Sequence, residues 1–244
     1  MLRDLFNNMP VVTKNLFLLC ILMFIVQLSG ENAFNGEGMT HKLGVYYIFS
    51  PYFEPYQVIT HMFCHGNVPH LLFNMLALIS IGSLLERVWG PKRFLVFYLI
   101  TGLGAVCIHE FAIGYDLYRA VGQWKVSDVT LTHDSINYNE LLYTEKQAQQ
   151  IMGAYLSPTL GASGAVFGLL VGLAMLFPNI ELMFIFLPIP IKAKYLVPVY
   201  VVIELMLGMK NYEMDNIAHF AHLGGALFGF ILIKLWQKNR TNFY

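Results

Sequence analysis

Charged residues are scarce in this sequence of 244 residues. Only 12% of them are Asp, Glu, Lys or Arg, whereas 57% are hydrophobic. A soluble domain carries roughly 25% charged residues, so this composition excludes an ordinary soluble domain and indicates several membrane spans. The charges also balance, with 15 basic and 15 acidic residues. Because no basic excess is available to bind phosphates, we expect no nucleic-acid partner.

Cysteines and metal-binding motifs are also few. Cys20, Cys64 and Cys107 lie in or beside apolar runs without the spacing of a metal site, so we interpret them as small buried residues. There is no HExxH motif, and we expect neither a metal nor another cofactor. A cleavable signal peptide is not expected, because the apolar run at 11–28 is long enough to stay as a span and no clear cleavage site follows it.

Long apolar runs are what the sequence has instead. A spanning helix needs about 20 mainly apolar residues, so the chain has room for roughly six spans and their loops. We predict an all-α membrane protein whose transmembrane helices form one domain, 15–236, between a short N-terminal segment, 1–14, and a tail, 237–244. The spans are expected at 11–28, 70–85, 94–113, 163–177, 195–209 and 217–236.

Two long loops join these spans. The loop 29–60 is rich in Tyr and Phe, which suit the membrane–water boundary, so we expect it to lie partly in the interface. The loop 115–156 is polar, and within it 139–152 is a candidate surface helix. Basic residues favour one side: ten of the 15 Lys and Arg residues lie with the termini and five on the other side. Both termini are therefore expected in the cytoplasm.

Two segments rich in small residues predict a close pair of helices. Ser163 opens the fourth span, and His222 lies one to two turns into the sixth. The small residues around them are Gly161, Gly164, Gly168, Gly172, Gly225 and Gly229. Glycine stripes let two backbones approach closely, and a hydroxyl within about 3 Å of an imidazole can act as a nucleophile with its base. A serine at a helix contact can instead bond a backbone carbonyl, and a histidine can be a satisfied interior residue.

A further polar segment opens the second span. His70 and Asn74 are four residues apart, so they share one helix face and can aim N–H donors at one point, as an oxyanion site requires. A polar helix contact is the alternative. We interpret His61 and His65 as structural hydrogen bonders and His219 as an interfacial residue. A metal site formed by these histidines is an alternative that stays open, although the sequence places no carboxylate at ligand spacing beside them.

In this combination the sequence resembles the rhomboid family of intramembrane serine proteases. The matching pieces, which cover about 57–234, are His70-x-x-x-Asn74, Glu86-Arg87 with Gly90, Gly161-x-Ser163-Gly164 and Ala221-His222-x-x-Gly225-x-x-x-Gly229. The GxSG motif alone is a weak signal, whereas the four together at membrane positions are a strong one. The chain departs from the family where Tyr56-Gln57 replaces the frequent Trp-Arg, and in the length of the loop 115–156.

The resemblance implies a rhomboid-like bundle with a membrane-embedded first loop and a Ser–His dyad. Ser163 would be the nucleophile and His222 the general base and then acid, while His70, Asn74 and the Ser163 backbone N–H stabilise the oxyanion. Phe167 falls where the family places an aromatic residue against the catalytic histidine. The remaining positions that the resemblance assigns to support or to substrate are Phe73, Gly161 and Gly225.

The resemblance also implies a cap at 210–216 over a water-filled cavity, and a lateral gate bordered by the fifth helix. It gives no role to Glu110 or Glu204, for which we expect interhelical hydrogen bonds.

The function predicted from these residues is that of an intramembrane serine endopeptidase. Its partners would be single-span or polytopic membrane-protein substrates and the lipid bilayer, and its location a bacterial inner membrane with the active site toward the outer side. Two alternatives stay open. One is a rhomboid-like protein that binds transmembrane segments without cutting them, and the other is a metal-dependent membrane hydrolase.

Overall fold

The computed structural model describes residues 6–30, 38–132, 135–184, 187–210 and 218–238. Helices dominate. The long ones are α2 (Val11–Gly30), α7 (Pro91–Val121), α9 (Ser163–Leu176), α10 (Ala193–Lys210), α11 (His219–Lys238), and α5 (Val68–Ala77), which continues through the π-helical turn η2 (Leu78–Gly82) into α6 (Ser83–Trp89). The shorter ones are α3 (Met39–Leu43), α4 (Gln57–Thr60), the 3-10 turn η1 (His61–Phe63) and α8 (Glu145–Leu156).

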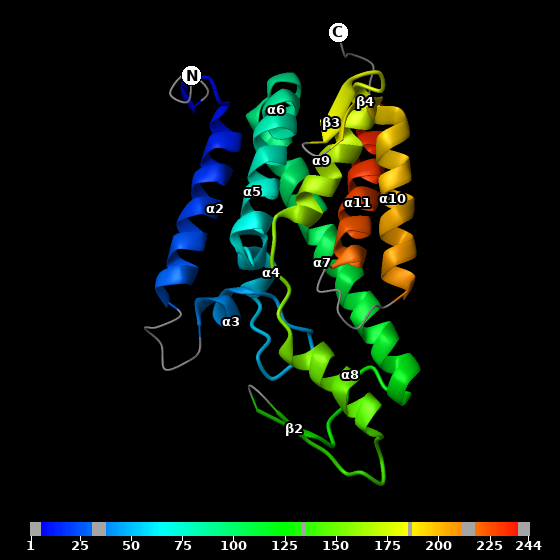
Figure 1. Ribbon diagram of the computed structural model, residues 1–244. Coiled ribbons are helices and arrows are strands. Elements are labelled where there is room, and N and C mark those ends of the chain that lie inside the picture. Colours follow the sequence, from blue (N-terminus) through cyan, green and yellow to red (C-terminus); the bar gives the residue numbers. More distant parts are fainter. Residues whose placement is uncertain (1–5, 31–37, 133–134, 185–186, 211–217, 239–244) are drawn as a thin grey trace.

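Two small antiparallel pairs of strands complete the part of the chain that the structure describes. They are β1 (Thr130–Leu131) with β2 (Ile136–Asn137), and β3 (Glu181–Phe184) with β4 (Leu187–Lys192). In the first, Thr130 pairs with Asn137, and in the second Glu181 pairs with Lys192. The long helices lie side by side, with β3 and β4 at one end of the bundle and β2 and α8 at the other (Figure 1).

The number of predicted spans is not confirmed by helix length and composition. Among the described residues, the segments that are long and apolar enough to cross a membrane are Val11–Ser29, Val68–Trp89, Pro91–Val121 and His219–Lys238, four in all. The helix α9 is apolar but has only 14 residues. The helix α10 has 18 residues, and its sequence includes three charged residues, Lys194, Glu204 and Lys210. An integral membrane protein with several spans is therefore established, while the count of six stays a prediction.

The start of α2 is bonded to the end of α6. The start of α2 and the end of α11 lie at the same end of the bundle (Figure 1). Glu86, near the end of α6, is buried and fixes α2 at that end, because its carboxylate accepts hydrogen bonds from the backbone N–H of Val12 at 2.9 Å and of Thr13 at 2.7 Å. These N–H groups belong to the first turn of α2 and have no partner within the helix, so a carboxylate is a suitable cap.

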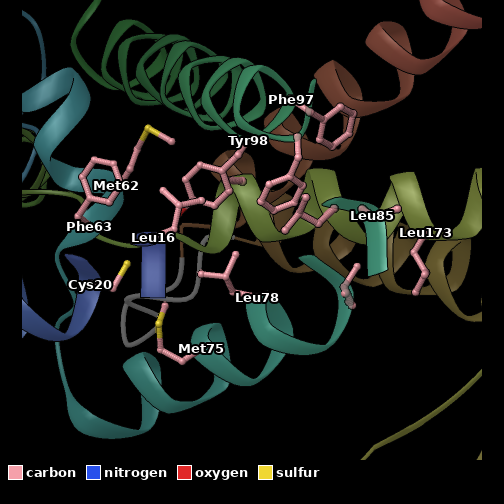
Figure 2. Close-up of a cluster of buried hydrophobic side chains, with 14 of the residues drawn as sticks. Leu16, Cys20, Met62, Phe63, Met75, Leu78, Leu85, Phe97, Tyr98 and Leu173 are labelled. Atoms are coloured by element: carbon pink, nitrogen blue, oxygen red, sulfur yellow. The ribbon is translucent and has the colours of Figure 1, made fainter. Parts of the chain in front are cut away.

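The main core lies between α2, the α5–α6 segment, α7 and α9. Side chains from these helices converge in Figure 2, and the cluster continues to Ile233 of α11. Its most completely buried members are Cys20, Leu78, Leu85, Phe94, Phe97, Tyr98 and Leu169. Cys20 and Cys64 are free and buried, as their apolar surroundings predict, whereas Cys107 is free but exposed, so the interpretation of a buried residue was wrong there.

Glycines set the spacing between α9 and its neighbours. A side chain at Gly225 would collide with the backbone of Gly164, and one at Gly229 would lie 3.0 Å from the Cα of Gly168. The predicted pairing of the two glycine stripes is therefore confirmed at these two levels. Gly172 departs from it, because its free face is directed at Trp89, Leu85 and Phe97 rather than at α11. The short α9 is thus enclosed by α7, α11 and the end of α6.

The long polar loop contains more structure than the sequence predicts. The helix α7 continues to Val121, beyond the predicted end at 113, and α8 spans Glu145–Leu156 rather than 139–152. The start of α8 is fixed by a capping box in which Thr144 and Gln147 exchange hydrogen bonds. A second buried cluster explains the longer α7, because Leu117 packs there; its other buried members are Tyr47, Val126, Tyr143, Ile151 and Tyr155.

The first loop is held to the bundle by side chains that bond its backbone. Gln57 is buried and contacts the backbone of four residues, accepting from Tyr46 and Glu54 and donating to Lys42 and Tyr52. All four partners belong to the same loop, so the glutamine that departs from the family pattern holds the loop in its folded shape. Glu110 of α7 accepts a hydrogen bond from the backbone N–H of Ile48 at 2.8 Å, so its expected bond to another transmembrane helix was wrong. The predicted cap lies outside the described residues from Asn211 onward.

Candidate active site

Ser163 and His222 face one another across the contact between α9 and α11. The Oγ of Ser163 lies 2.9 Å from Nε2 of His222, although 59 residues separate them in the chain. His222 is buried and Ser163 is partly buried. The contact follows from the glycine packing. Gly164 comes directly after Ser163 and Gly225 lies one turn after His222, and these two glycines let the backbones of the two helices touch. The distance is that of a hydrogen bond between a hydroxyl and an imidazole.

The chain enters α9 through a glycine that no other residue replaces easily. Gly161 has a φ of +131°, a backbone conformation that side chains disfavour. A Cβ at this position would also lie 2.8 Å from Cε1 and 2.9 Å from Nε2 of His70, and 3.5 Å from Oγ of Ser163. The N–H of Gly161 is held by the carbonyl oxygen of His61 at 2.9 Å. The sequence thus places Ser163 at the first turn of α9, where backbone N–H groups have no partner within the helix.

An aromatic side chain covers one face of the His222 ring. Phe167, one turn along α9 from Ser163, stacks on His222 with ring centroids 4.2 Å apart and an angle of 7° between the planes. Phe167 also contacts Tyr200 of α10, with centroids 5.0 Å apart. The stacking fixes the plane of the imidazole, as the resemblance implies for this position.

A carboxylate lies at the Nδ1 edge of the imidazole, opposite the edge that faces Ser163, and no role in a site was predicted for it from the sequence. Oε2 of Glu204, on α10, lies 2.9 Å from Nδ1 of His222 and 2.6 Å from Nδ1 of His219. Glu204 and His219 are both buried, with 4% and 6% of their surfaces exposed. The expected interhelical bond of Glu204 is confirmed. His219, interpreted from the sequence as interfacial, is buried and bonds this carboxylate. The sequence places no carboxylate at ligand spacing beside the histidines, and the fold brings Glu204 to them from another helix.

His70 and Asn74 lie on the helix that faces Ser163. The ring of His70 is directed at Gly161, beside the Ser163 hydroxyl, and packs edge to face on His65 with centroids 5.2 Å apart. Asn74 is buried, and its Nδ2 donates to the carbonyl oxygen of His70 at 3.0 Å. Phe73 is half exposed on the same helix. The binding of an oxyanion by His70 and Asn74 stays a prediction, and so does the contact of Phe73 with substrate.

The family follows from comparison with known proteins. The Rhomboid domain model matches residues 52–238, which is more than half of the chain and includes the whole site. The chain belongs to the rhomboid family. Among the similar curated proteins are the rhomboid protease GluP of Bacillus subtilis, 25% identical over 92% of this chain and 34% of its own length, and the rhomboid protease AarA of Providencia stuartii, 27% identical over 70% of this chain and 52% of its own length.

Mitochondrial proteins are among the relatives too. The presenilin-associated rhomboid-like protein of mouse is 26% identical over 74% of this chain and 42% of its own length. This rhomboid therefore spans about half, or less, of the length of the curated relatives that it matches. The names of the Bacillus subtilis and Providencia stuartii relatives identify proteases in the family.

Two further histidines of this rhomboid are buried outside the spans. Burial lowers the pKa of His61 to about 4, and it lowers the pKa of His65 to about 4 together with the nearby His70. Both rings are therefore neutral at pH 7. Nδ1 of His61 lies 2.9 Å from the carbonyl oxygen of Gln57, which accepts its N–H, and this agrees with the interpretation of His61 as a structural hydrogen bonder. The same interpretation of His65 was wrong, because neither of its ring nitrogens has a hydrogen-bond partner among the described residues.

A small cavity lies behind Ser163. Its volume is about 10 Å³, which is near the space that one water molecule needs. Its lining includes His61, Thr159, Gly161, Ser163, Ala218 and Ala221. The hydroxyl of Ser163 thus borders a space that is partly polar, although the surrounding helices are apolar.

One group of side chains in this rhomboid has the composition of a metal site. Ligand atoms of Glu204, His219 and His222 all lie within 4.8 Å of one another. Two imidazoles and a carboxylate can hold zinc. The separations of 2.6 and 2.9 Å between Oε2 and the two Nδ1 atoms are those of N–H···O hydrogen bonds, however, so the three side chains already satisfy one another.

Proposed function

We propose that this rhomboid is an intramembrane serine endopeptidase that cleaves membrane proteins with a dyad of Ser163 and His222. The observation that carries the proposal is the 2.9 Å contact between Oγ of Ser163 and Nε2 of His222. In the first step His222 accepts the proton of the hydroxyl while Oγ attacks the scissile carbonyl carbon. His222 then donates this proton to the leaving amine, which leaves an acyl-enzyme on Ser163. Water, activated by His222, hydrolyses the ester and restores the serine.

The oxyanion of the tetrahedral intermediate needs donors close to Ser163. The backbone N–H of Ser163 is one, because the first N–H groups of a helix have no partner within it and the helix dipole favours negative charge there. The His70 ring, beside Gly161 and the Ser163 hydroxyl, is a second. Asn74 is the third, since its amide carries two N–H groups and only one is needed for its bond to the His70 carbonyl.

The substrates that fit this site are helices of single-span or polytopic membrane proteins. Lipid excludes water, and a helix hides its carbonyls in hydrogen bonds, so a substrate must unwind before Ser163 can reach a carbonyl. Small or helix-breaking residues near the end of a span favour such unwinding. The start of α2 and the end of α11 share one end of the bundle, and α9 begins nearer the other (Figure 1). This arrangement puts the termini and the start of α9 in different halves of the bundle, which supports our proposal of cytoplasmic termini and an outward-facing site. The membrane that we propose is a bacterial inner membrane.

Two other functions compete with the protease. The cluster of Glu204, His219 and His222 favours a metal-dependent hydrolase, because two histidines and a carboxylate form the ligand set of several zinc enzymes. A rhomboid-like protein that binds transmembrane segments without cutting them needs no nucleophile. The hydrogen bond between Ser163 and His222 favours the serine protease over both.

The proposal is tested by cleavage of a generic transmembrane substrate with the protein purified in detergent. Ser163→Ala and His222→Ala should each abolish cleavage, whereas a chelator should leave it unchanged. Ser80→Ala is the matched control, because Ser80 is also a serine within a span but bonds only the carbonyls of its own helix. Cleavage by Ser163→Ala at the wild-type rate would exclude the dyad, and loss of activity with the chelator alone would favour the metal enzyme.

A further inference from the structure

Glu204 is a carboxylate in a place where carboxylates are costly. It lies in the second half of α10, with Ile203 and Leu205 beside it in the sequence, and 4% of its surface is exposed. A buried charge in a membrane protein is retained when it is paired or functional. Both of the hydrogen bonds that Glu204 makes to the described residues go to histidines of α11, and one of these histidines is the proposed catalytic base.

We infer that Glu204 is a positioning residue for His222, so that the site is a Ser163–His222–Glu204 triad built from three helices. This inference rests on the proposed protease function. The Nδ1 edge of the imidazole is held by the carboxylate at 2.9 Å, the Nε2 edge faces Ser163 at 2.9 Å, and one face is covered by Phe167. These contacts together fix the rotation and the plane of the ring.

The carboxylate also decides which nitrogen of His222 carries the proton. An ionised carboxylate only accepts hydrogen bonds, so Nδ1 of His222 must be the N–H donor. Nε2 then presents its lone pair to the Ser163 hydroxyl, as a general base must. When Nε2 takes the serine proton, the imidazolium forms 2.9 Å from a negative charge in an apolar environment. The carboxylate stabilises this state, and it does not itself take the proton.

His219 and Gly208 explain how α10 holds the carboxylate in place. The Nδ1 of His219 donates to the same oxygen at 2.6 Å, so Oε2 is fixed from two directions. Gly208, one turn beyond Glu204, lets α11 approach α10, since a Cβ there would lie 3.2 Å from Cβ of His219. Glu204 therefore reaches His222 because the two helices are close at this level, and His219 supports it without touching Ser163.

The test compares Glu204→Gln, Glu204→Asp and His219→Gln in the full-length protein. Glu204→Gln keeps the shape of the side chain and removes its charge. We expect kcat to fall by roughly 10²–10⁴-fold, the upper value being the loss known for the Asp→Asn change in a serine protease triad, with KM within about threefold of wild type. Glu204→Asp keeps the charge at a greater distance and should recover part of the loss. The rate of labelling of Ser163 by a fluorophosphonate should follow kcat.

His219→Gln is the matched control, because it removes the second partner of the same carboxylate oxygen while His222 keeps its own. We expect its kcat to fall by at most about tenfold. The unfolding temperature in detergent is measured for every variant. If Glu204→Gln fails to fold, Glu204→Asp and His219→Gln are compared instead. For each variant the loss of fluorophosphonate labelling is compared with the loss of unfolding temperature. The inference requires that Glu204→Asp lose more labelling per degree than His219→Gln.

Three outcomes would overturn the inference. The first is a kcat of Glu204→Gln within threefold of wild type. The second is an equal loss of kcat and of unfolding temperature in Glu204→Gln and His219→Gln, which would make Glu204 a tie between helices. The third is inhibition of the wild type by a chelator, which would make Glu204 a metal ligand. If Ser163→Ala cleaves as well as wild type, the proposed function itself fails; if it is inactive while Glu204→Gln is fully active, only the role of Glu204 is rejected.

Discussion

Gly225 of α11 packs directly on the backbone of Gly164 of α9. A Cβ at position 225 would overlap the carbonyl group of Gly164 and would lie 3.2 Å from its Cα. The obstacle is backbone rather than a flexible side chain, so it cannot move aside without moving the helix. Gly164 follows Ser163 in the chain, and His222 lies three residues before Gly225. The separation of the two helices at this point therefore also sets the separation of the hydroxyl and the imidazole.

We predict that Gly225→Val abolishes the proposed cleavage activity and destabilises the fold. The added methyl groups force α9 and α11 apart, which lengthens the Ser163–His222 contact and costs about 1–3 kcal/mol in packing. Cleavage assays and thermal unfolding in detergent measure the two effects. Gly153→Ala is the control, because a Cβ at this exposed position of α8 meets nothing within 4 Å. A Gly225→Val protein with wild-type activity would show that the close packing is not needed.

Asn74→Ala is predicted to slow cleavage by roughly 10–1,000-fold, near the range for loss of one oxyanion donor. The effect should lie in kcat rather than in KM, since the donor acts on the tetrahedral intermediate. Asn67→Ala is a matched control on the same helix: Asn67 caps α5 by accepting from the backbone N–H of His70 at 2.8 Å. Its loss should cost about 1 kcal/mol of stability and little activity. Equal rates for Asn74→Ala and wild type would remove Asn74 from the site.

Glu86→Gln should destabilise the bundle at the end away from Ser163. The carboxylate accepts the hydroxyl of Thr13 at 2.7 Å as well as two backbone N–H groups, and an amide in its place directs an NH₂ group at donors. We expect a loss of roughly 1–3 kcal/mol. Thr13→Val removes only the hydroxyl and should cost less. Activity at a temperature where both variants are folded should stay near wild type. An unchanged unfolding temperature in Glu86→Gln would contradict the capping role.

Stability should fall when the pH is lowered from about 6.5 toward 4. The pKa values of His61 and His65 are lowered to about 4 by burial, from about 6.5 in an unfolded chain. Below pH 6.5 the unfolded state therefore binds protons that the folded state does not. The stabilisation is complete above pH 6.5 and is lost as the pH falls through 4. Unfolding temperatures across this range measure it, and His65→Phe should flatten the slope. A constant unfolding temperature between pH 7 and pH 5 would contradict the prediction.

Much of the fold could be predicted because apolar runs in a membrane have few alternatives. A lipid-exposed backbone must satisfy its own hydrogen bonds, so each apolar run becomes a helix. The predicted start at residue 163 agrees with α9, where Gly161 and its positive φ precede the helix. The predicted end at 113 was wrong by eight residues, since α7 continues to Val121. The residues after 113 are mostly polar, so the sequence predicts that the helix ends there. Leu117 extends it by packing in the second cluster, which forms only in the folded chain.

The sequence by itself determined the chemistry available to this rhomboid: a serine directly before a glycine, a histidine before a glycine stripe, and apolar runs that form the helices carrying them. Tertiary structure alone decided what surrounds the histidine. Glu204 is 18 residues from His222, on a different helix, and nothing in that spacing indicates a contact. The contact depends on how closely α10 approaches α11 and on the side-chain direction of one glutamate. Both are set by packing between helices, which no pattern along a single chain records.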